Sequence, residues 1–477
     1  MIDSRFIPNH TPCGQTRREF LWQAGAGFAG LGLIDALTRD QAFAGELAAK
    51  PQHFSAKAKH CIFLFMNGGP SQVDTFDPKP ALTKWHGKKY TGPAEVGSNG
   101  RSIGYLTQTT FKFKNHGQSG LPISDIYPHL SAHADELCVI RSMHSGYNGH
   151  EVSIRYIHSG IPGITGRPTM GSWLLYGLGS ETANLPAYMV MTDPGGPPVD
   201  NIHNWSNGWM PSMFQGTVLR PRDPRILNLD APAHLRGDIQ RGNLGFLARL
   251  NRRHLEKHPG ERDLEARIAS YELAARMQTA AKEALDISGE TQETLDLYGL
   301  GDSTTREYGT RCLIARRMVE RGVRFVQLFL NSQPWDNHQN IKSALPGICR
   351  RTDKPAAALV TDLKRRGLLD TTIVHWGGEI GRLPVTEGDP DSGGRDHNGQ
   401  GFSAWLAGGG FKPGIVYGET DEVGHRAAVN KVTANDFQAT LLHQFGLDHS
   451  KLAFFHNGQE QTLTAGREAR VVHDIIS

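Results

Sequence analysis

Short apolar runs and longer helical patterns alternate along most of this chain. The first run, residues 61–66, ends in Asn67-Gly68-Gly69-Pro70, a pattern typical of a buried strand that leads into a loop. Similar runs predict strands at residues 138–140, 187–191, 323–330, 371–376 and 402–407. Between them, helical patterns lie at residues 149–158, 304–321, 354–366 and 434–445. Strands that alternate with helices predict an α/β fold with a doubly wound, mostly parallel sheet.

One stretch breaks this alternation. From about residue 244 to 297 the sequence is polar, alanine-rich and helical, with no strand signal. The composition, with 38% hydrophobic and 21% charged residues, is that of an ordinary globular protein. We therefore predict a single α/β domain over residues 55–477, with a helical insertion at about 225–300.

The first 44 residues have the pattern of a secretory signal. Arg17-Arg18 precedes a weakly apolar, glycine-rich stretch at residues 24–37, and Ala42-Phe43-Ala44 forms a small-x-small cleavage site. Adjacent arginines address the twin-arginine translocase, so we expect a periplasmic or extracellular protein that is exported already folded. The alternative is an amphipathic helix that stays on the protein, which the glycine content disfavours.

The charge and the apolar pattern argue against a nucleic-acid-binding protein and against a transmembrane helix in the mature chain, and the cysteines have their own expected state. The net charge of +3, with scattered basic residues, gives no reason to expect a nucleic-acid partner. After the signal there is no apolar stretch of 18 residues, so no transmembrane helix is predicted in the mature chain. Cys61 and Cys138 lie in apolar runs and are expected to be buried thiols, with disulfide pairing as the alternative.

Polar side chains follow several of the predicted strands. Because ligands bind beyond the carboxyl ends of parallel strands, these residues are candidates for one shared site. A set of unrelated turns and caps is the alternative. The candidates are Asn67, Asp74, Arg141, Ser142, His144, His150, Asp336, His338, Glu379, Arg382, Asp396 and His397.

This mixture of histidines and carboxylates is suited to binding one or two divalent metal ions. Histidine with carboxylate favours zinc or manganese, whereas sites made only of oxygen favour magnesium or calcium. Asp336, His338 and His397 could form one site, and Glu379 and Asp396 with a group from the first strand's loop could form a second. Two ions would stabilise the attacking and leaving oxygens of a displacement at phosphorus or sulfur.

Three residues are candidates for the chemical step. Ser142 precedes a predicted helix start and could be a nucleophile, although a helix cap is the alternative. His144 and His150 could transfer protons or orient a substrate. A structural role for His150 is an equal alternative.

Three further residues could contact an anionic substrate. Arg141 and Arg382 could each form two hydrogen bonds to an anionic group, or could instead be ion-pair partners at the surface. Asn67 stands at the end of the first predicted strand, where a substrate would lie.

Four sequence blocks resemble those of the DUF1501 family. Residues 65–79, FMNGGPSQVDTFDPK, look like the family signature, and residues 335–338, 376–382 and 394–398 are similar to its later blocks. The family is grouped with the alkaline phosphatase and sulfatase superfamily. The resemblance therefore implies a doubly wound sheet and a site with one or two metals that hydrolyses phosphate or sulfate esters.

The chain departs from that superfamily at several positions. Asn67 stands where the first strand usually ends in a metal-binding aspartate, and Asp74 lies seven residues later. Gly378-Glu379 replaces the usual Asp-His pair, and the Cys-x-Pro-x-Arg pattern of sulfatases is absent. Asp336, His338 and His397 match the expected ligand types better.

The function expected from the sequence is therefore an exported, metal-dependent hydrolase. Its substrate would be an anionic small molecule or a polysaccharide ester. The alternative is a non-catalytic binding or assembly protein on the same fold. A metal-dependent isomerase or phosphotransferase is a third possibility, but no feature of the sequence selects it.

Overall fold

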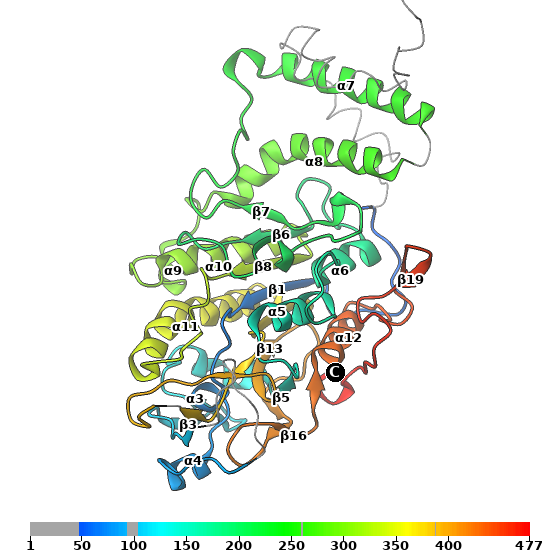
Figure 1. Ribbon diagram of the computed structural model, residues 1–477. Helices are drawn as coiled ribbons and strands as arrows, with labels where there is room; N and C mark the ends of the chain where they lie inside the picture. Colours follow the sequence, from blue (N-terminus) through cyan, green and yellow to red (C-terminus); the bar gives the residue numbers. More distant parts are fainter. Residues whose placement is uncertain (1–46, 93–103, 259–260, 387) are drawn as a thin grey trace, which may run out of the picture. The chain divides into compact units, whose positions relative to one another are not determined.

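A computed structural model describes residues 47–92, 104–258, 261–386 and 388–477 (Figure 1). The predicted signal, including Arg17 and Arg18, lies outside the described residues, so export stays a prediction. The described residues form two compact units, one of residues 228–272 and one of residues 47–227 with 273–477. All of the candidate site residues belong to the second unit.

A nine-stranded sheet lies at the centre of the second unit. Its strands follow the order β14-β5-β13-β9-β1-β8-β6-β7, and β17 also pairs with β5. Only β13 runs antiparallel to its neighbours, which are β5 and β9. The predicted doubly wound, mostly parallel sheet is therefore confirmed. The strands are β1 (His60–Phe65), β5 (Leu137–His144), β6 (Tyr188–Met191), β7 (Thr217–Leu219), β8 (Phe325–Phe329), β9 (Thr372–Gly377), β13 (Phe402–Ala407), β14 (Ile415–Tyr417) and β17 (Val432–Thr433).

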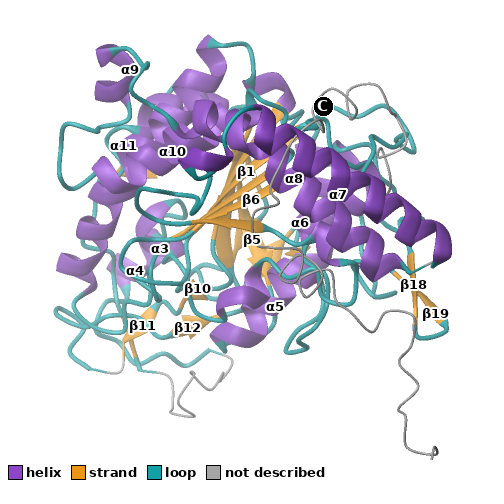
Figure 2. Cartoon of the chain, turned by 90° about the horizontal axis from the view of Figure 1, so that it is seen from above, coloured by secondary structure: helices purple, strands orange, loops and turns teal. Residues whose placement is uncertain are grey.

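Helices cover both faces of this sheet, as Figures 1 and 2 show, with α5 and α6 on one face and α10 and α11 on the other. All residues of β1 and β9 are buried, because a strand covered on both faces needs a continuous apolar run rather than an alternating one. The main helices of this unit are α5 (His150–Ser159), α6 (Met170–Leu178), α10 (Arg306–Val319), α11 (Ile341–Arg365) and α12 (Ala434–Gln444).

Two helices differ from the prediction. Helix α6 was not predicted, and α11 begins 13 residues before residue 354, where its predicted start lay. Pro346 and Pro355 lie inside α11. Proline normally breaks a helix because it lacks an N–H donor, so the sequence pattern hid the first half of this one.

The remaining elements are short or lie in the predicted insertion. Helices α7 (Asp238–Lys257), α8 (Arg262–Leu285) and α9 (Gln292–Leu297) occupy the region expected to be helical, while the domain boundaries themselves stay a prediction. Two short helices are α3 (Gln72–Thr75) and α4 (Pro80–Lys84). The two-stranded pairs are β2 (Tyr105–Leu106) with β11 (Val385–Thr386), β3 (Phe113–His116) with β4 (Leu121–Ser124), β10 (Gly381–Arg382) with β12 (His397–Asn398), β15 (Glu419–Thr420) with β16 (Ala427–Val429), and β18 (Phe454–His456) with β19 (Gln459–Gln461).

The cysteines of the described chain are buried and free, which confirms the expectation for Cys61 and Cys138. Burial raises the pKa of the Cys138 thiol to about 12, so this group is inert at neutral pH. Among the helices of the described residues, none combines the length and the apolar character that a membrane crossing requires.

Candidate metal centre

Two glycines at the end of β1 allow the neighbouring loops to approach closely. Gly68 has a φ of +110°, and a Cβ there would lie 2.7 Å from the backbone nitrogen of Asp336. Gly69 has a φ of +79°, and a Cβ there would lie 2.7 Å from the Ile380 side chain. Only glycine fits both the backbone conformation and the space. The loops that follow β8 and β9 can therefore pack against the end of β1.

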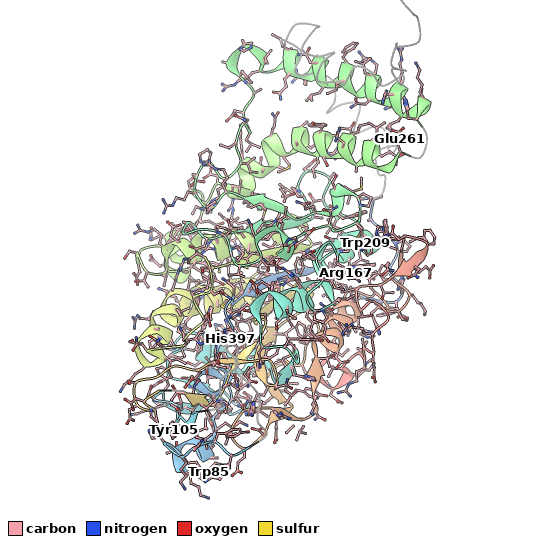
Figure 3. The ribbon with its side chains drawn as sticks, in the orientation of Figure 1. Trp85, Tyr105, Arg167, Trp209, Glu261 and His397 are labelled. Atoms are coloured by element: carbon pink, nitrogen blue, oxygen red, sulfur yellow. The ribbon has the colours of Figure 1, made fainter. Side chains whose placement is uncertain are left out.

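Four segments bring polar side chains to this edge of the sheet. Asp336 and His338 lie in the loop after β8, and Glu379 is the second residue after β9. His150 is the first residue of α5, which follows β5. His397, labelled in Figure 3, belongs to β12, where it pairs across the strands with Arg382 of β10.

The nitrogen atoms of three histidines converge on one carboxylate oxygen. Asp336 Oδ1 lies 3.0 Å from His338 Nε2, 3.1 Å from His397 Nε2 and 3.5 Å from His150 Nε2. Ligand atoms about 2.0–2.1 Å from a tetrahedral zinc ion would be about 3.3 Å apart. The observed spacing therefore fits a metal ion placed between these groups.

Two overlapping groups of residues could hold such an ion. In the first, ligand atoms of His150, Asp336 and His397 all lie within 4.8 Å of one another, and in the second those of His338, Asp396 and His397 do. His397 belongs to both groups, but its Nδ1 is 2.7 Å from the carbonyl oxygen of Asn148. Only Nε2 is left to bind a metal, so the two groups are alternative ligand sets for one ion.

A hydrogen-bond partner at Nδ1 orients the ring of each of the two buried histidines, His150 and His397. His150 Nδ1 lies 2.6 Å from Glu379 Oε1, and His397 Nδ1 donates to the Asn148 carbonyl. When Nδ1 carries the proton, Nε2 presents its lone pair to the centre, as metal-binding histidines require. The Nε2 atom of His150 is buried and has no hydrogen-bond partner within normal distance. These residues therefore fit a bound divalent ion.

The electrostatics of the cluster also favour a cation. Burial alone would lower the pKa of His150, but the nearby Asp336 carboxylate and the hydrogen bond to Glu379 outweigh burial and raise the pKa to about 9. Burial would raise the pKa of Asp336, yet the surrounding imidazoles and Arg382 hold the pKa well below its usual range. The carboxylates thus attract positive charge, which a metal ion can supply in place of the proton on His150.

Arg382 positions the cluster rather than facing an open space. Its side chain is fully buried, and a terminal guanidinium nitrogen lies 2.6 Å from Asp336 Oδ1. The same nitrogen donates to the Gly68 carbonyl, and Nε donates to the Gly69 carbonyl at 3.0 Å. The guanidinium is thus used by the protein and holds Asp336 in place, which differs from the substrate contact that the sequence suggested.

Glu379 and Asp74 were both expected to bind metal, but each has other partners in the structure. Glu379 Oε1 accepts hydrogen bonds from His150 Nδ1 and from the backbone nitrogen of Gly68, so Glu379 lies behind a ligand. Asp74 forms a buried ion pair with Arg395, with 2.7 Å between Oδ2 and Nε, and accepts a hydrogen bond from Ser71. The structure does not bring Asp74 to the centre.

Ser142 and His144, which were expected beyond the predicted strand at residues 138–140, lie within β5 instead. β5 continues to His144, four residues beyond its predicted end. The predicted end was too early because Arg141 interrupts the apolar run that marks the strand. Ser142 therefore lies inside the strand, where its hydroxyl donates to the Asn430 carbonyl at 2.6 Å. It is neither next to the start of α5 nor in the cluster. His144 lies opposite Thr433 of β17.

Asn67 and Arg141 have structural partners as well. The Asn67 side chain donates to the carbonyls of Leu330 and Ser332 and accepts from the Leu330 nitrogen, so it ties the end of β1 to the end of β8. Arg141 Nε donates to the Phe76 carbonyl at 2.7 Å. Neither side chain is brought to the metal centre.

Sequence reasoning missed one functional contact. The Asn148 carbonyl fixes the ring of His397, and a backbone atom carries no residue-type signal. His150 was expected to transfer protons, to orient a substrate or to have a structural role, and the structure groups it with the candidate ligands.

The fold and the cluster together define an α/β protein with a candidate histidine–carboxylate metal centre at the edge of its sheet. The family model described as "Protein of unknown function (DUF1501)" matches residues 58–476, so the chain belongs to this family. This confirms the resemblance seen in the sequence. A search of curated proteins gave no match.

Several solved structures are distantly similar to this chain. The PsFucS1 sulfatase from Pseudoalteromonas sp. has a TM-score of 0.35 and 13% identity, and the alignment covers 91% of this chain and 75% of the sulfatase chain. The phosphonate monoester hydrolase SpPMH from Silicibacter pomeroyi has a TM-score of 0.32 and 12% identity, and the alignment covers 67% of this chain and 68% of the hydrolase chain. The alkaline phosphatase from the Antarctic bacterium TAB5 has a TM-score of 0.28 and 9% identity, and the alignment covers 78% of this chain and 96% of the phosphatase chain.

Proposed function

We propose that this protein is a metal-dependent hydrolase of phosphate or sulfate esters. The observation that carries the proposal is the convergence of His150 Nε2, His397 Nε2 and Asp336 Oδ1, with both histidines held from behind. A bound divalent ion, with zinc or manganese favoured by this donor set, supplies Lewis acidity toward a phosphoryl or sulfuryl oxygen.

The exposure of the cluster indicates the side from which a substrate arrives. The side chains of His338 and Asp336 are 36% and 23% exposed, whereas those of His150 and His397 are each 9% exposed. The anionic group of an ester therefore reaches the centre from the side of His338. The fully buried Arg382 keeps the Asp336 carboxylate in position for binding.

The predicted leader gives this activity a place in the cell. If the twin-arginine signal at residues 1–44 is used, the centre forms before export, and the substrates are esters of the periplasm or the cell exterior.

Turnover of aryl phosphates and aryl sulfates tests the proposal. The full chain is loaded with Zn²⁺ or Mn²⁺ and compared with His397→Ala and with His144→Ala. The second variant is a matched control, because His144 also lies at the end of a central strand but outside the cluster. We expect turnover that is lost in His397→Ala and kept in His144→Ala. Turnover that survives His397→Ala would contradict the proposal.

A non-catalytic metal-binding protein on the same fold is the second candidate. It is favoured by one observation, that the hydroxyl of Ser142, the serine expected to be the nucleophile, is used inside the sheet. The same samples separate the two candidates. Metal bound in a fixed ratio, without turnover of either ester class, would support the second.

A further inference from the structure

A short ribbon of backbone lies next to Arg395, which precedes His397 by two residues. The nitrogen of Gly87 donates to the Leu106 carbonyl at 2.9 Å, the nitrogen of Leu106 donates to the Lys88 carbonyl at 2.9 Å, and Lys89 lies across from Tyr105. β2 pairs in turn with β11, where Thr386 lies across from Tyr105. Residues 87–89, which are not themselves a strand, thus lie beside β2, and β2 lies beside β11; we call these three segments the flanking ribbon.

Two connections join the flanking ribbon to the centre. A terminal guanidinium nitrogen of Arg395 donates to the Thr107 carbonyl at 3.0 Å, and Arg395 directly precedes Asp396 and His397. In addition, Gly393 forms a β-bridge with Gln339, the residue after His338. The end of the ribbon therefore contacts the segment that carries His397, and this segment in turn pairs with the loop that carries His338, the most exposed histidine of the centre.

The surface of the ribbon combines an aromatic ring with positive charge. Tyr105 is 43% exposed, and Lys84, Lys88 and Lys89 are exposed as well. Residues that face each other in antiparallel strands present their side chains on the same side, so Tyr105 and Lys89 are neighbours. Figure 3 labels Tyr105 together with Trp85, whose ring lies 5.6 Å from the Lys84 ammonium.

The charges of these lysines are available to a ligand. None of the ion pairs among the described residues involves Lys84, Lys88 or Lys89, and an acidic side chain at this segment, Asp391, lies 3.2 Å from His86. An exposed ring offers an apolar face, and a lysine pairs with an anion as a point charge.

We propose that the flanking ribbon binds an anionic polysaccharide, with the Tyr105 ring against the face of a sugar and Lys89 paired with a sulfate or phosphate group. A sugar chain held in this way would run along the ribbon toward the open side of the centre. The identification of the chain as a substrate rests on the proposed function, whereas binding itself does not. An acidic peptide is the competing ligand, but a peptide makes less use of an exposed aromatic face.

Retardation in gels that contain dextran sulfate tests this proposal without turnover. We expect the full chain to be retarded by dextran sulfate, and less so at high salt, but not by neutral dextran. Tyr105→Ala and Lys89→Glu should each weaken binding by about tenfold, while Tyr105→Phe, which keeps the ring, should bind normally. Phe455→Ala and Lys451→Glu are matched controls, because these side chains are 68% and 74% exposed elsewhere and should bind normally.

Two outcomes would overturn the proposal. One is equal retardation of the chain and of both ribbon variants, each shown by its melting curve to be folded. The other is competition by polyglutamate as effective as that by free dextran sulfate, which would assign the ribbon to acidic peptides. Turnover of aryl esters is measured separately on the unmodified chain, and retardation by dextran sulfate should be the same for His397→Ala as for the unmodified chain, so a failed binding test and a failed turnover test can be told apart.

Discussion

Replacement of Glu379 by glutamine tests how the centre is built. Glu379 Oε1 lies 2.6 Å from His150 Nδ1 and 3.0 Å from the Gly68 nitrogen. Glutamine keeps the shape and an acceptor oxygen but removes the charge. A hydrogen bond to a charged acceptor contributes about 1.5–3 kcal/mol, against about 0.5–1.5 kcal/mol for a neutral one. The loss of roughly 1–1.5 kcal/mol in the orientation of His150 predicts metal binding that is about tenfold weaker.

Competition with a chromophoric chelator measures this affinity for Zn²⁺. The control is Asp353→Asn, because Asp353 is also a buried carboxylate, but it accepts hydrogen bonds from the backbone nitrogens of His129 and Leu130 outside the centre. Unchanged affinity in Glu379→Gln would refute the orienting role. A loss as large as that of His150→Ala would show that Glu379 is itself a ligand, as the sequence first suggested.

Three further predictions concern other parts of the structure. Gly68→Ala should destabilise the fold by about 1–3 kcal/mol and weaken metal binding, because its Cβ would meet the Asp336 backbone; an unchanged denaturant midpoint would contradict this. Ser142→Ala should lower the free energy of unfolding by about 1 kcal/mol, because the hydrogen bond to Asn430 is lost, but should leave metal binding intact. If the folded variant lost all turnover, Ser142 would again be the candidate nucleophile. Burial lowers the pKa of His375 from 6.5 to about 3, so the unfolded chain binds more protons between these values and stability falls as pH drops below about 6.5. His375→Phe should reduce this fall between pH 7 and pH 4.5 in urea titrations, and an equally steep fall would contradict it.

The central sheet and its functional edge could be predicted from the sequence. Strands buried on both faces need continuous apolar runs, such as residues 61–66, and in a parallel sheet the residues that follow such strands meet at one edge. Asp336 and His338 follow such a strand, whereas His397 precedes the strand at residues 402–407; the three were expected to share one site, and the structure places them together.

The roles of individual carboxylates could not be predicted. Asp74 and Glu379 look alike in a sequence, and their partners decide what each does. Arg395, 321 residues away, pairs with Asp74, whereas His150, 229 residues away, pairs with Glu379. Such long-range contacts leave no local pattern.

The serine expected as nucleophile shows a second cause of error. Arg141 interrupts an apolar run, and the strand was therefore ended too early. The Arg141 side chain instead donates to the Phe76 carbonyl, which allows β5 to continue through Ser142 to His144. Arg141 Nε also lies 3.7 Å from Asp77 Oδ1, and both of these partners are visible only in the folded chain.

Elemental analysis of the purified chain tests the central claim most directly. After loading with Zn²⁺ or Mn²⁺ and dialysis, the proposed centre predicts one metal ion per chain, and less than about a tenth of an ion in His397→Ala, which belongs to both ligand sets. His144→Ala should retain the full amount. A metal-free wild-type chain after loading, or full occupancy in folded His397→Ala, would contradict the account.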